Sequence, residues 1–105
     1  MYRVIFEHIV KAGQEQAFID RWQAGSDVIQ TYPGARGTLL FKSKDSDNTY
    51  YAMAEWESIE ARQSAMSEIA KREDAEIIMH GHEQYVEKYT TLLSADHIAS
   101  SLPKS

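Results

Sequence analysis

One segment that passes directly from a strand into a helix constrains the fold more than any other feature. Residues 49–56 are apolar and alternate in the manner of a β-strand. Ser58 follows as a good N-cap residue, and a helix is predicted from residue 59 to about residue 71. The Trp56-Glu57-Ser58 junction therefore joins a strand to a helix with almost no loop between them.

The remaining pattern adds three strands and one long helix to this unit. Apolar periodicity predicts strands over residues 2–10, 35–43 and 82–93, a helix over residues 14–32, and a shorter helical piece over residues 73–80. Gly81 is placed to end that shorter piece. The order β-α-β-β-α-β is the split ferredoxin-like arrangement, which is an α+β fold with a four-stranded antiparallel sheet and helices on one face. We expect one domain over residues 1–93 and a polar tail or arm over residues 94–105.

The first strand carries apolar side chains on both of its faces. Val4, Phe6, His8 and Val10 share the face that we assign to the helices, whereas Ile5 and Ile9 share the other with Arg3 and Glu7. A sheet face of this composition is too apolar to remain in contact with water. We therefore predict a homodimer that forms through the open sheet face.

Composition excludes several classes of function. The chain has 105 residues and a net charge of −5, and its eleven Lys and Arg residues are scattered, so a nucleic-acid partner is not expected. It contains no cysteine, which removes disulfides, thiolate metal sites and thiol nucleophiles. No apolar run approaches the length of a membrane span, and the first residues alternate like a strand rather than a signal peptide. These features predict a cytoplasmic protein without a membrane partner.

Several short segments resemble the antibiotic biosynthesis monooxygenase family. Ala-Glu-Trp-Glu-Ser-Ile-Glu-Ala at residues 54–61 resembles the strand-to-helix signature of that family. Val-Ile-Phe-Glu at residues 4–7, followed by Lys-Ala-Gly at 11–13, resembles its first strand, and Pro-Gly-Ala-Arg-Gly at 33–37 resembles its turn into the second strand. The resemblance covers residues 2–93 and implies a dimeric α+β barrel. Some members are cofactor-independent monooxygenases or quinol oxidases of polycyclic phenols, and others degrade haem.

The sequence departs from the haem-degrading branch at the positions that matter there. That branch has an Asn on the first strand, where this chain offers Phe6 and His8. It also has a Trp where Ala65 and Met66 stand here, and a His where residues 74–77 contain none. Haem degradation is therefore disfavoured. The Asn, Trp and Tyr side chains by which other members hold polyketides do not map convincingly onto this chain either.

His8 is the candidate catalytic residue. Histidine has an intrinsic pKa near 6.5, so His8 could accept a proton from a phenol or a hydroquinone. The alternative is a buried neutral histidine that bonds a backbone carbonyl or a tyrosine. The candidate walls of an aromatic substrate pocket are Phe6, Trp22, Tyr51, Trp56, Met66 and Tyr85. At this spacing the same residues could equally be core, with Trp56 as a plug between helix and sheet.

No cofactor or metal is expected from the motifs. His80 and His82 flank Gly81 and could form a metal pair, but they straddle a predicted helix end, so we expect a surface pair. Phosphate-loop, flavin and nicotinamide fingerprints do not occur. Two hypotheses remain: a cofactor-independent monooxygenase of a small phenol, quinol or polyketide-like substrate, and a non-catalytic dimeric small-molecule-binding or stress-response module. A cavity that reaches His8 and solvent favours the first, and full packing around His8 favours the second.

Overall fold

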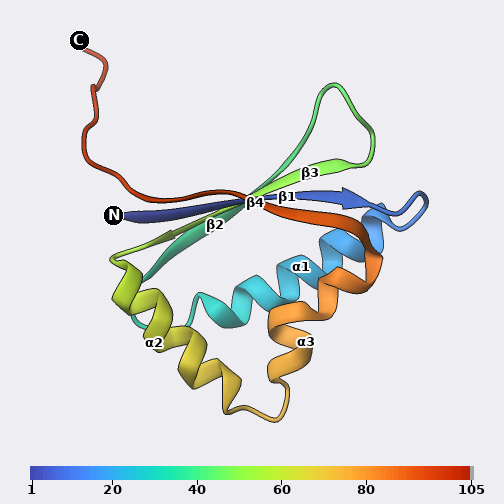
Figure 1. Cartoon of the computed structure of the whole chain (residues 1–105), viewed down its shortest axis with the longest axis horizontal. Coiled ribbons are helices and arrows are strands. Elements are labelled where there is room, and N and C mark those ends of the chain that lie inside the picture. The colour runs from blue at the N-terminus through green and yellow to red at the C-terminus, as the bar shows by residue number, and fades with distance from the viewer. Residues whose placement is uncertain (105) are drawn as a thin grey trace.

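The computed structural model describes residues 1–104 and contains one four-stranded sheet covered by helices. The elements are β1 (Tyr2–Val10), α1 (Glu15–Ile29), β2 (Ala35–Lys42), β3 (Thr49–Trp56), α2 (Ile59–Ala70), α3 (Ala75–His80), the 3₁₀ turn η1 (Gly81–Tyr85) and β4 (Val86–Asp96). The strands lie in the order β2-β3-β1-β4 and all pairs are antiparallel. All three α-helices lie on one side of the sheet (Figure 1). The predicted ferredoxin-like α+β fold is confirmed. Across the described residues, no helix combines the length and apolar character that crossing a membrane requires.

The fourth strand begins later than the sequence predicts. Residues 81–85 form η1 instead of the start of the strand, and β4 begins at Val86. Gly81 does not end α3 in a left-handed conformation, because its φ is −58° and the chain continues into the turn. The side-chain amide of Gln84 donates to the Gly81 carbonyl at 2.8 Å and closes that turn. The prediction that a strand starts at His82 was therefore wrong, and His82 lies on a helical turn.

The end of β4 also differs from the prediction. The strand continues past residue 93 to Asp96, which pairs with Tyr2 at the start of β1. The backbone amide of His97 then donates to the carbonyl of Met1 at 2.6 Å. The first three residues of the predicted tail are thus part of the sheet, because β1 offers them free backbone partners.

The core forms where the alternation of β1 directs side chains toward the helices. Val4, His8 and Val10 are buried, and Phe6 is half-buried beside them. Trp56 is 1% exposed at the end of β3 and packs in a cluster with Tyr2 and Val4. The Oγ of Ser58 accepts a hydrogen bond from the Ala61 amide at 3.1 Å, which caps α2 as predicted. The strand-to-helix junction therefore serves the fold, with Trp56 as its buried anchor.

Gly25 allows α1 to approach α3 closely. A Cβ atom added at Gly25 would lie 2.6 Å from the carbonyl oxygen of Ile78. Only glycine fits at this contact, because the neighbouring atom belongs to the backbone. The glycine costs α1 some helix propensity and in return lets α3 pack against α1 at Ile78, which is buried.

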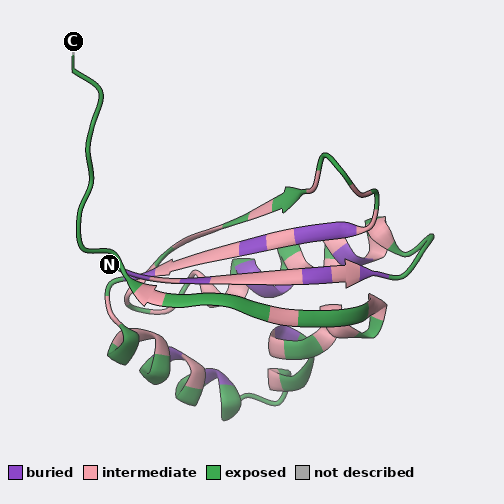
Figure 2. Cartoon of the chain, turned by 45° about the horizontal axis from the view of Figure 1, so that its top comes forward, coloured by how far each residue is buried: buried purple, intermediate pink, exposed green. Residues whose placement is uncertain are grey.

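The open sheet face is the surface opposite the helices, formed by Arg3, Ile5, Glu7, Leu39, Phe41, Tyr51, Met53, Glu55 and Leu93. Residues of this face on neighbouring strands lie directly opposite one another: Leu39 pairs with Met53, and Phe41 pairs with Tyr51. Several are large and exposed: Leu39 is 52%, Phe41 49% and Leu93 43% exposed. In Figure 2 the outer strand β4 is largely exposed. The apolar character predicted for this face is present.

Candidate functional site

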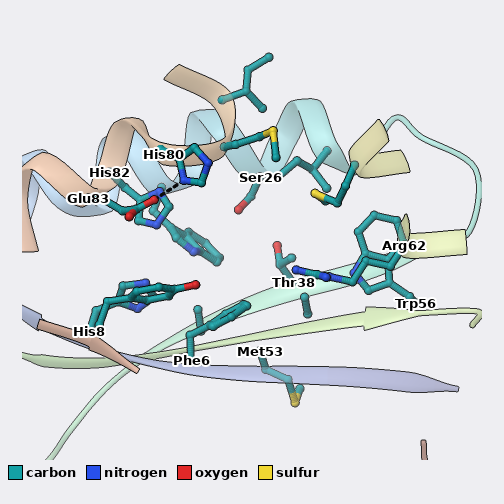
Figure 3. A pocket seen from close by; sticks show the side chains of 18 residues that line it. Phe6, His8, Ser26, Thr38, Met53, Trp56, Arg62, His80, His82 and Glu83 are labelled. Atoms are coloured by element: carbon teal, nitrogen blue, oxygen red, sulfur yellow. Dashed lines mark hydrogen bonds and ion pairs between the residues drawn. The ribbon is translucent and has the colours of Figure 1, made fainter. Parts of the chain in front are cut away.

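A cavity of about 170 Å³ lies between the sheet and the helices. Its floor comes from β1, β2 and β3, its roof comes from α1, α2 and α3, and η1 and β4 close one end (Figure 3). Phe6, Trp22, Trp56, Met66 and Tyr89 give it apolar and aromatic walls. A cavity of about 150 Å³ with such walls can hold benzene. The space is therefore sufficient for a single aromatic ring.

His8 lies at the centre of an aromatic cluster at one end of the cavity. Its ring centroid lies 5.2 Å from that of Phe18 and 5.4 Å from that of Tyr89. The residue is 1% exposed, and its Nδ1 is a buried atom that has no hydrogen-bond partner anywhere in residues 1–104. Leaving a buried polar group unbonded costs about 1–3 kcal/mol. His8 is thus buried, as one of the two interpretations expected, but its Nδ1 lacks the backbone or tyrosine partner that interpretation included.

Burial determines the charge of His8. Desolvation is the main cause that lowers its pKa from 6.5 to about 4, His82 lowers it further, and Glu83 acts in the opposite direction. The ring is therefore neutral at pH 7 and each of its nitrogens is either a donor or an acceptor, according to the tautomer.

His82 belongs to the same end of the cavity. Its ring lies 5.4 Å from that of His8 and 6.0 Å from that of Phe18. Burial is the main cause that lowers its pKa; Glu83 raises it, whereas His80 and Arg21 lower it. The expectation that His80 and His82 form a surface pair was wrong for His82, because η1 turns that side chain inward.

His80 is half-exposed at the rim, where its Nδ1 contacts the carboxylate of Glu83. Figure 3 shows His80, His82 and Glu83 together on the helical side, above His8. In the part of the chain that the structure describes, no group of three or more His, Asp or Glu side chains is arranged to hold a metal ion.

The other end of the cavity carries a cation. Arg62 on α2 extends its guanidinium group into the cavity beside Thr38 and Trp56 (Figure 3). None of the ion pairs found within residues 1–104 involves Arg62. The cavity walls are thus mainly apolar, with histidines at one end and a guanidinium at the other.

Most of the predicted wall residues meet in this cavity. Phe6, Trp22, Trp56 and Met66 line it together with His8. Tyr51 does not, because its neighbour Tyr50 takes the helix-facing position and Tyr51 lies on the open sheet face opposite Glu7. Tyr85 does not line it either, since it lies in η1 and packs against the cluster of Val10, Phe18 and Tyr50.

Sequence reasoning missed Tyr89, His82 and Arg62 as members of the site. Tyr89 opposes His8 across β1 and β4, a register that alternation alone does not reveal. The position of Arg62 could have been predicted from the sequence. It lies four residues before Met66 on the same helix, so the two side chains share a face.

Comparison with known proteins agrees with this architecture. A model of the antibiotic biosynthesis monooxygenase family matches residues 1–72. No curated protein is significantly similar to the sequence.

Solved structures share the fold at low sequence identity. SnoaB, described as a cofactor-independent oxygenase from Streptomyces nogalater, is 15% identical, with 98% of this chain and 97% of that chain covered and a TM-score of 0.74. A structure described as an antibiotic biosynthesis monooxygenase is 13% identical, with 94% and 100% covered and a TM-score of 0.74. The protein PA3566 from Pseudomonas aeruginosa is also 13% identical, with 93% and 94% covered and a TM-score of 0.72. At these identities the structures establish a common fold.

Proposed function

We propose that the chain, which belongs to the antibiotic biosynthesis monooxygenase family, oxidises a small phenolic aromatic with O₂ and needs no bound cofactor. The observation that carries this proposal is His8. It is a neutral, buried histidine with an unbonded Nδ1, at the end of a cavity with aromatic walls. The fold shared with SnoaB, a cofactor-independent oxygenase, supports the same assignment.

The dimensions of the cavity favour a small substrate. About 170 Å³ holds one aromatic ring. Tyr89 and His80, which are both half-exposed, line the cavity and connect it to the surface. A single-ring quinol fits this volume, and a naphthol fits if these rim side chains move, whereas a polycyclic polyketide requires a larger opening. The preferred substrate is thus a phenol of one or two rings.

His8 is proposed as the acceptor of the phenolic proton. Without a neighbouring anionic substrate an imidazolium at His8 is unstable, since the pKa is about 4. A phenolate formed beside it supplies the missing opposite charge and raises that pKa, as Glu83 already does to a smaller extent. Proton transfer and substrate binding are therefore coupled.

The phenolate then transfers one electron to O₂, which gives a phenoxyl radical and superoxide. Their combination at a ring carbon ortho to the hydroxyl gives a peroxide anion, which takes back the proton that His8 accepted and becomes a hydroperoxide. Loss of water, with the proton of that carbon, leaves a quinone. One oxygen atom enters the ring and the other leaves as water, and the substrate supplies all four electrons. The chain contributes position, the proton acceptor and a cavity that excludes bulk water from the radical pair.

We further propose that two copies pair through the open sheet face. Leu39, Phe41 and Leu93 would bury their exposed side chains in such a dimer. The charges on this face are partly matched, because Arg3 and Glu55 form an ion pair at 2.7 Å, and Glu7 lies opposite Tyr51 in the sheet register. A second sheet of the same composition can therefore cover the face without isolating a carboxylate.

Oxygen uptake tests the proposed activity. Purified protein, without added metal or flavin, is supplied with a panel of phenols, hydroquinones and anthrone-like compounds, and is compared with His8→Ala and with the tail variant His97→Ala. We expect uptake by the wild type and His97→Ala, and a loss of at least about a hundredfold in His8→Ala. Uptake that survives in His8→Ala would contradict the role of His8. Binding of these phenols without any uptake would indicate the binding module instead.

A further inference from the structure

We propose that the cavity selects an aromatic substrate with a carboxylate at the end opposite its hydroxyl, and that Arg62 binds this carboxylate. The inference rests on the proposed function for the hydroxyl end, where His8 lies, and extends it by naming the chemical class of the substrate.

The first observation is the position of Arg62. It follows the Ser58 cap of α2 by one turn and lies four residues before Met66, which also lines the cavity. Its guanidinium group extends between the helix and the sheet toward the interior (Figure 3). The side chain thus enters the cavity instead of leaving it for solvent.

The second observation is the lack of an acidic partner. Arg3, Arg36 and Arg72 pair with Glu55, Glu57 and Asp74 at 2.7, 2.6 and 2.8 Å. Over residues 1–104 no such ion pair is made by Arg62, although the chain has a net charge of −5 and is rich in carboxylates. Arg62 is therefore available to an anion that enters the cavity.

The third observation is the charge distribution along the cavity. The only acidic side chain among its lining residues in the described chain is Glu83, which contacts His80 at the histidine end. The end near Thr38 and Trp56 carries only the guanidinium charge. A guanidinium group binds a carboxylate through two parallel hydrogen bonds, which are stronger than those between neutral groups.

The sheet register sets the spacing between the two ends. Thr38 is in register with Ala54 and, through it, with Val4 on β1. Val4 and His8 are four residues apart, which corresponds to about 13 Å along a strand. The reach of the Arg62 side chain shortens this span. A molecule of one or two rings with its hydroxyl and carboxylate at opposite ends bridges His8 and Arg62.

A purely structural role predicts something different. Arginine can cover an aromatic ring with its methylene chain alone, and Arg62 lies beside Trp56. Arg62→Met keeps an unbranched apolar side chain and removes the charge. Arg62→Lys keeps the charge but cannot form two parallel hydrogen bonds to one carboxylate. The two variants therefore separate packing from anion binding.

Calorimetric titration with three ligands tests the inference. 6-Hydroxy-2-naphthoate carries its two groups at opposite ends, 3-hydroxy-2-naphthoate carries them on adjacent carbons, and 2-naphthol lacks the carboxylate. We expect the wild type to bind the first at least about tenfold more tightly than either of the others. Arg62→Met should lose this preference with its affinity for 2-naphthol retained, and Arg62→Lys should keep part of it. Arg36→Met, at an exposed position whose partner is Glu57, should behave as the wild type.

Equal wild-type affinity for 6-hydroxy-2-naphthoate and 2-naphthol would overturn the inference. So would an unchanged preference in Arg62→Met, equally tight binding of the adjacent isomer, or no binding of any of the three ligands. Oxygen uptake with neutral phenols is measured separately. A failure of the carboxylate preference is thereby distinguished from a failure of the proposed oxygenase activity.

Discussion

The ring of His82 stands edge-on to the ring of His8, with centroids 5.4 Å apart and 73° between the planes. The contact exists because residues 81–85 form the 3₁₀ turn η1 instead of the first residues of the predicted fourth strand. This turn directs His82 over β1. Burial lowers the pKa of both residues, and His82 lowers that of His8 further. Burial and the neighbouring His82 therefore keep His8 neutral, so the addition of a proton to His8 depends on a negative charge arriving with the substrate.

Replacement of His82 should raise the pKa of His8. His82→Gln removes a titratable ring whose charge, when it is protonated, lowers the pKa of His8, and its removal therefore favours the imidazolium form of His8. NMR titration of the His8 ring should show a pKa above the wild-type value of about 4. His97→Gln, in the exposed tail, is the matched control and should leave the His8 titration unchanged. An unchanged or lower pKa of His8 in His82→Gln would show that the two rings are not electrostatically coupled.

Stability should fall on acidification between pH 6.5 and pH 4. In this range the unfolded chain binds a proton at His8, with its ordinary pKa of 6.5, whereas the native protein does not, since its pKa is about 4. The contribution of His8 is fully present above pH 6.5 and is lost as the pH falls toward 4. We expect a loss of about 3 kcal/mol in the free energy of unfolding, because a pKa difference of one unit corresponds to about 1.4 kcal/mol.

Urea denaturation at several pH values measures this loss. His8→Gln cannot take up the proton, so its free energy of unfolding should depend less steeply on pH, although His82 still contributes in the same direction. Identical slopes for the wild type and His8→Gln over this range would rule out a depressed pKa at His8.

Gly25→Ala should destabilise the protein although alanine favours helices. The added Cβ would meet the backbone oxygen of Ile78 at 2.6 Å, so α1 and α3 must separate. We expect a net loss of about 1–3 kcal/mol by denaturant unfolding. Gln23→Ala, at an exposed position of the same helix, should change stability by less than about 0.5 kcal/mol. If Gly25→Ala were neutral or stabilising, the close contact between the helices would not be required.

A charge on the open sheet face should separate the proposed dimer. We expect light scattering to give the wild type a mass of twice 12.0 kDa at micromolar concentration. Leu39→Asp places a carboxylate among apolar side chains of the predicted interface and should yield a monomer. Leu102→Asp, at a 78% exposed position in the tail, should remain dimeric. A monomeric wild type would contradict the proposal.

The fold was accessible from the sequence because its signals are local. The alternation of β1 separated Val4, His8 and Val10 from Ile5 and Ile9, and the Ser58 cap located the start of α2. Periodicity also placed His8 in the interior. These features depend on residues close together in the chain, where period and capping chemistry decide the outcome.

The site was only partly accessible, since it depends on long-range register and on one unusual turn. Tyr89 reaches His8 only through the pairing of β4 with β1, which includes a register shift. His82 reaches the cavity because residues 81–85 form η1. The sequence His-Glu-Gln-Tyr-Val at residues 82–86 alternates well enough to predict a strand instead. Tyr51 was assigned to the pocket on its aromatic character, but the alternation of β3 gives the helix-facing position to Tyr50.

Isotope labelling tests the central claim most directly. The wild type is incubated under ¹⁸O₂ with a phenol that supports oxygen uptake, without metal or flavin, and the quinone is trapped at once by reduction and acetylation before mass spectrometry. The account predicts one ¹⁸O atom in the trapped product, the other in water, and no labelled product with His8→Gln. Unlabelled quinone with accumulation of hydrogen peroxide, or equal labelling by His8→Gln, would contradict a monooxygenase in which His8 accepts the phenolic proton.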